Sequence, residues 1–190
     1  QADARIGNWF EEPATATVTG TGSEWKITGL LEIGIDDLSD PFFSEAGILT
    51  ISAGGMVTAD EVRIASTGAL YLGDGGLAGT LDAGTISNAG TIVANFTDAS
   101  TLAAGISGDG TLEKYGAGTL SLDGVNYYHG PTTVFGGRLD VNGVLVFSTA
   151  TVKAGATIGG GGATDDIIVE SGGRLAPGTS IGHLTTGSIS

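Results

Sequence analysis

The chain has 190 residues, enough for one domain, and its 35 glycines, 4 prolines and 41% apolar residues fit an ordered β protein rather than collagen, a linker or a disordered segment. It has no cysteine, which excludes disulfides and thiolate metal sites. The net charge of −14 repels nucleic acid and anionic membranes, so we expect neither as a partner.

The first candidate site residue in chain order is Trp25, which lies among Ser, Thr and Gly residues. Its indole could stack on a sugar ring, or it could cover the first layer of the domain. We favour the covering role, because the ends of a repeat domain must be shielded from water.

The segment from Ile35 to Glu45 contains no glycine and interrupts the repeats that surround it. It predicts a projecting loop that binds a partner. Its candidate partner-binding residues are Asp36, Asp37, Asp40, Phe42, Phe43 and Glu45. Two alternatives stay open: the Phe pair folds back over the domain, or the carboxylates bind a cation. Because the segment lacks the spacing of known calcium loops, we predict no metal site.

A five-residue pattern of Gly, any residue, apolar, any residue, apolar recurs along the chain. Clear copies begin at Gly47, Gly68, Gly118 and Gly137, and weaker ones at Gly79, Gly90, Gly110 and Gly173. The alternation of apolar side chains predicts strands, and the fixed spacing predicts a solenoid. The predicted fold is all-β, a single right-handed parallel β-helix over residues 1–190 with about 18–22 residues per coil.

Residues 124–135 form a second distinct segment, in which three aromatic residues and a histidine surround Pro131. This composition predicts a turn followed by a strand. We include Tyr127 and Tyr128 among the candidate partner-binding residues.

The later part of the chain resembles a known family. Residues 108–122 read GDGTLEKYGAGTLSL and, with residues 126–143, are similar to the autotransporter-associated β-strand repeat. Residues 175–184 read LAPGTSIGHL and resemble a signature that follows this repeat, with Thr179 and His183 in place of the usual Asn and Thr. Residues 17–34 resemble other repeats of large autotransporter passengers.

Charge and motifs together suggest two regions within the single domain. Residues 1–123 carry 17 acidic and 4 basic side chains, a net −13, and include the predicted projecting loop. Residues 124–190 carry 4 acidic and 3 basic side chains, a net −1, and include the Ala-Pro-Gly-Thr-Ser signature.

The resemblance implies a passenger domain that a Gram-negative bacterium secretes by the type V route to its surface. It also implies an outer-membrane β-barrel, C-terminal to this segment, as the anchor. Such passengers are most often adhesins, so the implied partner is a host cell receptor, a matrix component, a glycan or another copy of the chain.

Catalytic patterns are weak. The two histidines, His129 and His183, lie far apart in the sequence, and no Gly-x-Ser-x-Gly motif is present. The acidic pair Asp165 and Asp166 lies in a glycine-rich turn. We therefore predict no enzyme and no cofactor. The alternatives are a β-helical polysaccharide-cleaving enzyme and a folding scaffold without a partner of its own.

Overall fold

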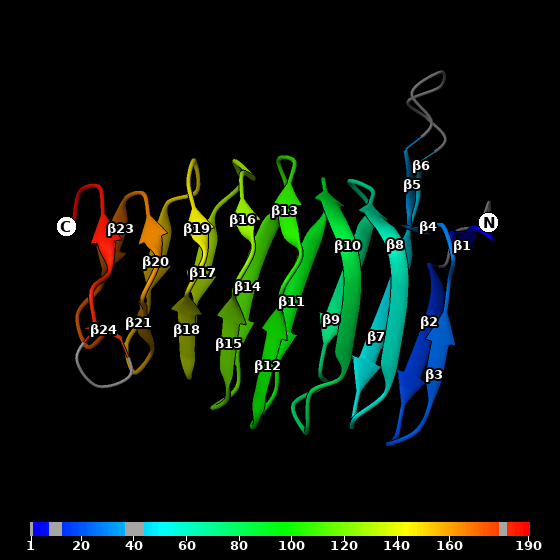
Figure 1. Cartoon of the computed structure of the whole chain (residues 1–190), viewed down its shortest axis with the longest axis horizontal. Coiled ribbons are helices and arrows are strands. Elements are labelled where there is room, and N and C mark those ends of the chain that lie inside the picture. Colours follow the sequence, from blue (N-terminus) through cyan, green and yellow to red (C-terminus); the bar gives the residue numbers. More distant parts are fainter. Residues whose placement is uncertain (1, 8–12, 37–43, 179–181) are drawn as a thin grey trace.

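The computed structural model describes residues 2–7, 13–36, 44–178 and 182–190. Over these residues every regular element is a β-strand, and the strands wind into a solenoid of about seven turns (Figure 1). The predicted all-β parallel solenoid is therefore confirmed. The described residues include no helix long and apolar enough to cross a membrane.

One face of the solenoid is a continuous parallel sheet of eight strands. In order these are β2 (Ala14–Thr19), β7 (Gly47–Ser52), β9 (Gly68–Leu72), β11 (Thr91–Asn95), β14 (Thr111–Tyr115), β17 (Thr132–Val134), β20 (Ala150–Val152) and β23 (Ile167–Val169). Gly47 pairs with Gly68 and Ala150 pairs with Ile167, so the coils become slightly shorter toward the C-terminus. The first coil is the longest of these, since Ala14 pairs with Gly47, and its extra length contains the segment at 35–45.

The opposite face changes along the axis. Near the N-terminus it is one sheet built around two long strands, β8 (Met56–Ile64) and β10 (Thr80–Asn88). Its shorter strands are β1 (Ala4–Ile6), β4 (Leu30–Ile33) and β13 (Gly105–Ser107), with β3 (Glu24–Lys26) beside β8. Toward the C-terminus it becomes two narrower sheets. The first contains β12 (Ala99–Leu102), β15 (Thr119–Leu122), β18 (Arg138–Val141), β21 (Thr157–Gly160) and β24 (Arg174–Pro177). The second contains β16 (Val125–Asn126), β19 (Val144–Leu145), β22 (Ala163–Thr164) and β25 (Thr185–Thr186).

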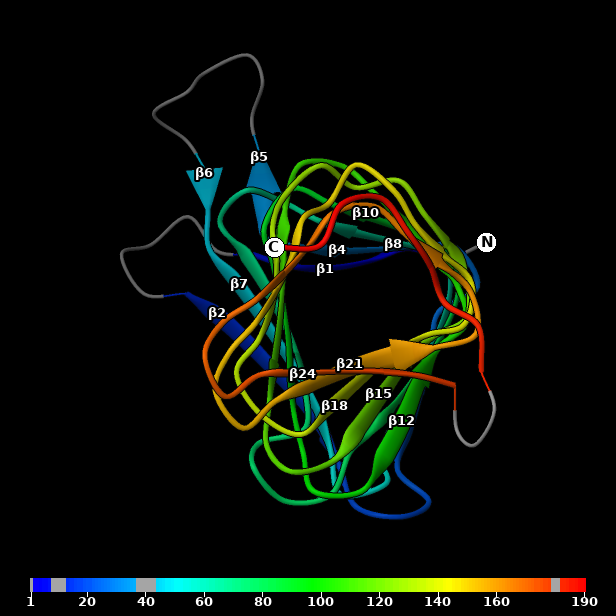
Figure 2. The ribbon, with the colours of Figure 1, turned by 90° about the vertical axis from the view of Figure 1, so that its left-hand side faces the viewer.

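The division occurs at β10. Its second half pairs with β13, and its first half lies against β12 of the neighbouring sheet. The coils therefore contribute to two parallel sheets at the N-terminal end and to three at the C-terminal end. In the axial view the strands wind around one interior (Figure 2).

The core consists of inward side chains that stack in rows from coil to coil. Leu49, Leu70, Ile92 and Leu112 occupy paired positions on successive strands of the eight-stranded face, and all four are buried. Burial of apolar area stabilises the fold by roughly 25 cal/mol per Å². Because each row continues through neighbouring coils, each coil is held by the coils on either side.

A second inward row contains a charged residue. Lys114 follows Ala94 and precedes Val134 in this row, and it is fully buried. Its Nζ lies 4.9 Å from the centre of the Phe96 ring and donates hydrogen bonds to the carbonyl oxygens of Tyr115 and Gly116. Burial lowers the pKa of the Lys114 amine to about 8.

Arg138 joins three coils near the C-terminal end. Its guanidinium pairs with Asp140 at 2.6 Å and donates to the carbonyl oxygens of Ala176, at 3.1 Å, and Gly178, at 3.0 Å. It reaches these by passing over Gly159 on the intervening strand β21, where a Cβ atom would overlap with the guanidinium. A residue larger than glycine at 159 would therefore displace the arginine.

Candidate functional site

A two-stranded hairpin leaves the solenoid where the sequence predicts a projecting loop. Its strands, β5 (Ile35–Asp36) and β6 (Ser44–Glu45), pair antiparallel with each other and run away from the stacked coils in Figure 1. Asp36 is exposed, and its carboxylate accepts hydrogen bonds from the backbone N–H (2.9 Å) and hydroxyl (2.6 Å) of Ser66. The base of the hairpin is thus tied to the next coil.

The other predicted residues of this segment divide into two groups. Glu45 is only 6% exposed, its Oε2 has no hydrogen-bond partner among the described residues, and its carbonyl oxygen accepts from Thr67 at 2.8 Å. The carboxylate therefore faces inward rather than toward a surface partner. Asp37, Asp40, Phe42 and Phe43 lie outside the described residues.

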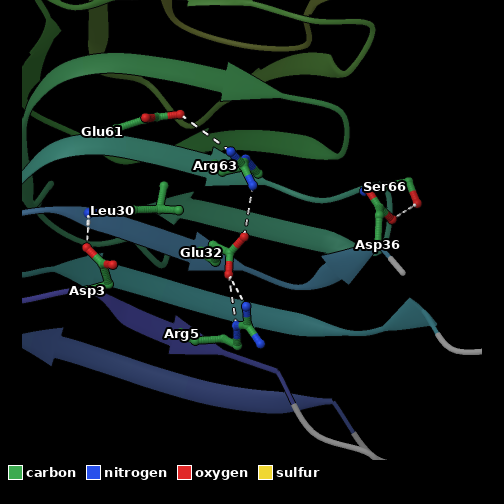
Figure 3. Close-up of polar contacts among 8 residues, drawn as sticks. All are labelled: Asp3, Arg5, Leu30, Glu32, Asp36, Glu61, Arg63 and Ser66. Atoms are coloured by element: carbon green, nitrogen blue, oxygen red, sulfur yellow. Dashed lines mark hydrogen bonds and ion pairs between the residues drawn. The ribbon is translucent and has the colours of Figure 1, made fainter. Parts of the chain in front are cut away.

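A ladder of charged side chains crosses the outer face beside the hairpin (Figure 3). Arg5, Glu32 and Arg63 occupy paired positions on β1, β4 and β8. Arg5 approaches one oxygen of Glu32 to 2.6 Å, and Arg63 approaches the other to 3.1 Å. Both arginine side chains are more than half exposed, so each ion pair adds little stability.

A shallow hollow of about 410 Å³ lies between this ladder and the base of the hairpin. It is lined by Arg5, Glu32, Gly34, Ile35, Asp36, Arg63 and Ala65. Its lining combines two arginines and two carboxylates with the apolar side chains of Ile35 and Ala65, and such a mixture suits a polar contact with another molecule.

Trp25 lies in β3 and pairs with Val57 of β8. Its side chain is partly buried and packs against the hydrophobic core. This packing is what a covering role requires.

The two tyrosines of the aromatic segment point in opposite directions. Tyr127 is 52% exposed, whereas Tyr128 is fully buried, and its hydroxyl bonds Thr132 Oγ1, which in turn bonds Ser148 Oγ at 2.8 Å. Burial raises the pKa of Tyr128 to about 12. Tyr128 therefore belongs to the core and is not placed to touch a partner.

Tyr127 instead belongs to a surface group that we call the aromatic column, formed by Tyr127, His129 and Phe147. The His129 and Phe147 rings stack at 5.2 Å with an interplanar angle of 7°, and the Tyr127 and Phe147 centroids lie 6.4 Å apart. Asp109 lies at one end of the column, with its Oδ1 3.6 Å from His129 Nδ1.

No sequence motif distinguishes Arg5, Arg63 or Phe147. The two arginines are distant in the sequence, so only the pairing of β1, β4 and β8 brings them together. Phe147 is an isolated aromatic residue in a glycine-poor turn, and nothing in its local sequence distinguishes it.

The acidic pair that sequence analysis weighed for catalysis lies on the surface. Asp166 accepts hydrogen bonds from the Ser188 N–H at 2.8 Å and from the Ser188 hydroxyl at 2.6 Å, and these bonds lower the pKa of the Asp166 carboxyl. Among the residues that the structure describes, no group of three His, Asp or Glu side chains could hold a metal ion.

Two curated proteins are similar to parts of the chain. One is an adhesin, the BmaC autotransporter of Brucella suis biovar 1 (strain 1330), 45% identical over 109 residues, which are 54% of this chain and 3% of that protein. The other is an extracellular serine protease of Serratia marcescens, 42% identical over 79 residues, which are 42% of this chain and 8% of that protein. No family model and no solved structure matches the chain.

The fold defines the class as a parallel β-solenoid with stacked apolar rows. Together with these two relatives, it supports an autotransporter passenger domain located at the cell surface or secreted by a Gram-negative bacterium. The chain spans less than a tenth of either relative's length.

Proposed function

We propose that this segment is a rigid stalk of a cell-surface passenger protein and that it contributes adhesive contacts to host cells or their matrix. The observation that carries the proposal is the inserted hairpin beside a charged hollow, on a solenoid that is otherwise continuous. The stacked rows supply stiffness, and the insertion supplies a surface that stacking does not require.

The adhesin relative supports this role over about half of the chain. The protease relative shows that proteins with a different named activity also contain such a segment. Proteolysis is the weaker proposal here, because His129 bonds no serine hydroxyl among the described residues and is instead stacked on Phe147.

Adhesion is tested with beads coated with the 190-residue chain and applied to host cell monolayers and to immobilised matrix proteins. One variant replaces residues 36–45 with an Asn-Gly turn, and a second carries Arg5→Ala and Arg63→Ala. The control is Lys153→Ala, which removes an ion pair with Glu170 far from the hollow.

We expect the unaltered chain and the Lys153→Ala control to attach, and both hairpin and arginine variants to lose most attachment. If the folded chain attaches to neither surface, the adhesion proposal is overturned and the segment serves only as a structural scaffold. Beads that bind only one another would show self-association instead.

A further inference from the structure

We propose that the aromatic column of Tyr127, His129 and Phe147 is a binding site for a neutral glycan chain. This inference rests on the proposed adhesive function and names the chemical class of one ligand. It concerns a surface well separated along the chain from the hairpin and its charged hollow.

The aromatic column exposes large apolar side chains to solvent. Tyr127 is 52% exposed and Phe147 is 58% exposed, and with Val125, at 45%, they form a patch spread over two successive coils. Phe, Trp and Tyr make up only 6% of the chain, so two of them beside a histidine ring on one surface are a marked concentration.

The backbone at Phe147 adopts a conformation that is costly for a bulky residue. Its φ is +69°, in the left-handed region that glycine favours. The next residue, Ser148, is fully buried, and its hydroxyl donates to the Gly130 carbonyl oxygen at 2.7 Å. Ser148 thus anchors the turn from inside, while the strained neighbour holds its ring out in water. Strain of this kind persists where surrounding contacts hold it in place, and such positions cluster at functional sites.

The surroundings of the rings match the surface of a sugar. A pyranose presents an apolar C–H face, which packs on an aromatic ring, and a rim of hydroxyl groups, which need hydrogen-bond partners. The column offers the Tyr127 hydroxyl and the imidazole of His129 beside its rings, and the Asp109 carboxylate, with a side chain 90% exposed, stands at one end.

Charge selects a neutral ligand. The exposed Asp109 carboxylate lies at the site itself and belongs to the strongly acidic region of residues 1–123, so sulfated or uronic acid glycans would be repelled. A protein partner is less well matched, because a stable protein interface needs a larger apolar centre than three rings beside an exposed carboxylate.

The test is a titration of the 190-residue chain with chitohexaose, cellohexaose and maltohexaose, followed by NMR chemical shifts of the aromatic side chains. A hyaluronan oligosaccharide serves as the anionic comparison. The variants are Tyr127→Ala and Phe147→Gly, the second of which suits the positive φ and preserves the turn. Phe135→Ala is the matched control, because Phe135 is also 40% exposed but stacks on Tyr115 instead.

We expect at least one neutral hexasaccharide to bind, no binding of hyaluronan, and affinity about ten-fold weaker in Tyr127→Ala and Phe147→Gly than in Phe135→Ala. The proposal is overturned if no neutral probe binds, if hyaluronan binds better, or if all three variants bind alike. Bead attachment through the hairpin would persist in that case, so the two proposals fail separately.

Discussion

Lys114 has an environment unlike that of an ordinary lysine, since it lies in an inward row between Ala94 and Val134. The alternation along the strand predicts an inward position for Lys114, because it lies two residues after the inward Leu112. What the sequence does not show is how the charge is accommodated, since the carbonyl acceptors and the Phe96 ring are set by the neighbouring turns.

Lys114→Met should stabilise the protein at neutral pH by about 1 kcal/mol or more, because it replaces a buried cation with an apolar chain of similar size. The folded-state pKa of about 8 lies below the ordinary 10.5, so the unfolded state binds more protons between these values. The stability of the unaltered chain therefore rises with pH through this window.

Urea unfolding at about pH 7 and about pH 9.5 measures this effect, and the advantage of Lys114→Met should shrink at the higher pH. The range stops there because Tyr128, with a pKa of about 12 in the fold, ionises near its ordinary pKa of 10.0 once unfolded. An advantage that does not change with pH would show that the Lys114 amine does not titrate as described.

The absence of a side chain at Gly159 leaves room for the Arg138 guanidinium, and this gives a second prediction for a single residue. Gly159→Ala should lower the free energy of unfolding by about 1–3 kcal/mol, because its Cβ would overlap with Arg138 and the Ala176 carbonyl oxygen. Gly161→Ala is the matched control, since a Cβ there meets nothing within 4 Å, and should cost less than about 0.5 kcal/mol. Equal costs would argue against a special role for the arginine.

Among the elements, the repeat pattern located strands well. The phrases that begin at Gly47, Gly68, Gly118 and Gly137 correspond to β7, β9, β15 and β18. Tyr127 and Tyr128 were both predicted to bind a partner, but the alternation of exposed and buried residues continues past the end of β16, so only Tyr127 faces solvent. The charged ladder and the division of the long sheet at β10 were not predictable, because both depend on which strands become neighbours.

The β5–β6 hairpin should be dispensable for folding, because within the part of the chain that the structure describes its two strands form hydrogen-bonded ladders only with each other. Replacing residues 36–45 with an Asn-Gly turn removes the Asp36–Ser66 bonds, but it also removes the buried Glu45 carboxylate, whose Oε2 has no partner among the described residues. These effects offset each other, so the melting temperature should change by only a few degrees. Loss of cooperative unfolding would show that the hairpin is part of the core.

For the whole molecule, the difference in net charge between the acidic region and the nearly neutral region has physical consequences. Residues 1–123 carry a net −13, and residues 124–190 carry −1. Mutual repulsion destabilises a compact state, and salt screens it.

Added sodium chloride should therefore stabilise the N-terminal coils more than the C-terminal ones. Hydrogen exchange measured peptide by peptide at low and at high salt checks this, with protection gained mainly before Gly124. A uniform gain along the chain would point to a general salt effect rather than to relief of repulsion.

The Arg138 contacts also bear on how the solenoid would respond to a pulling force. A load applied at the C-terminal end along the axis passes directly from β24 to β18 through one guanidinium, as well as through β21. Three coils therefore carry that load together and should detach as one block, whereas coils joined only to their neighbours can peel away singly.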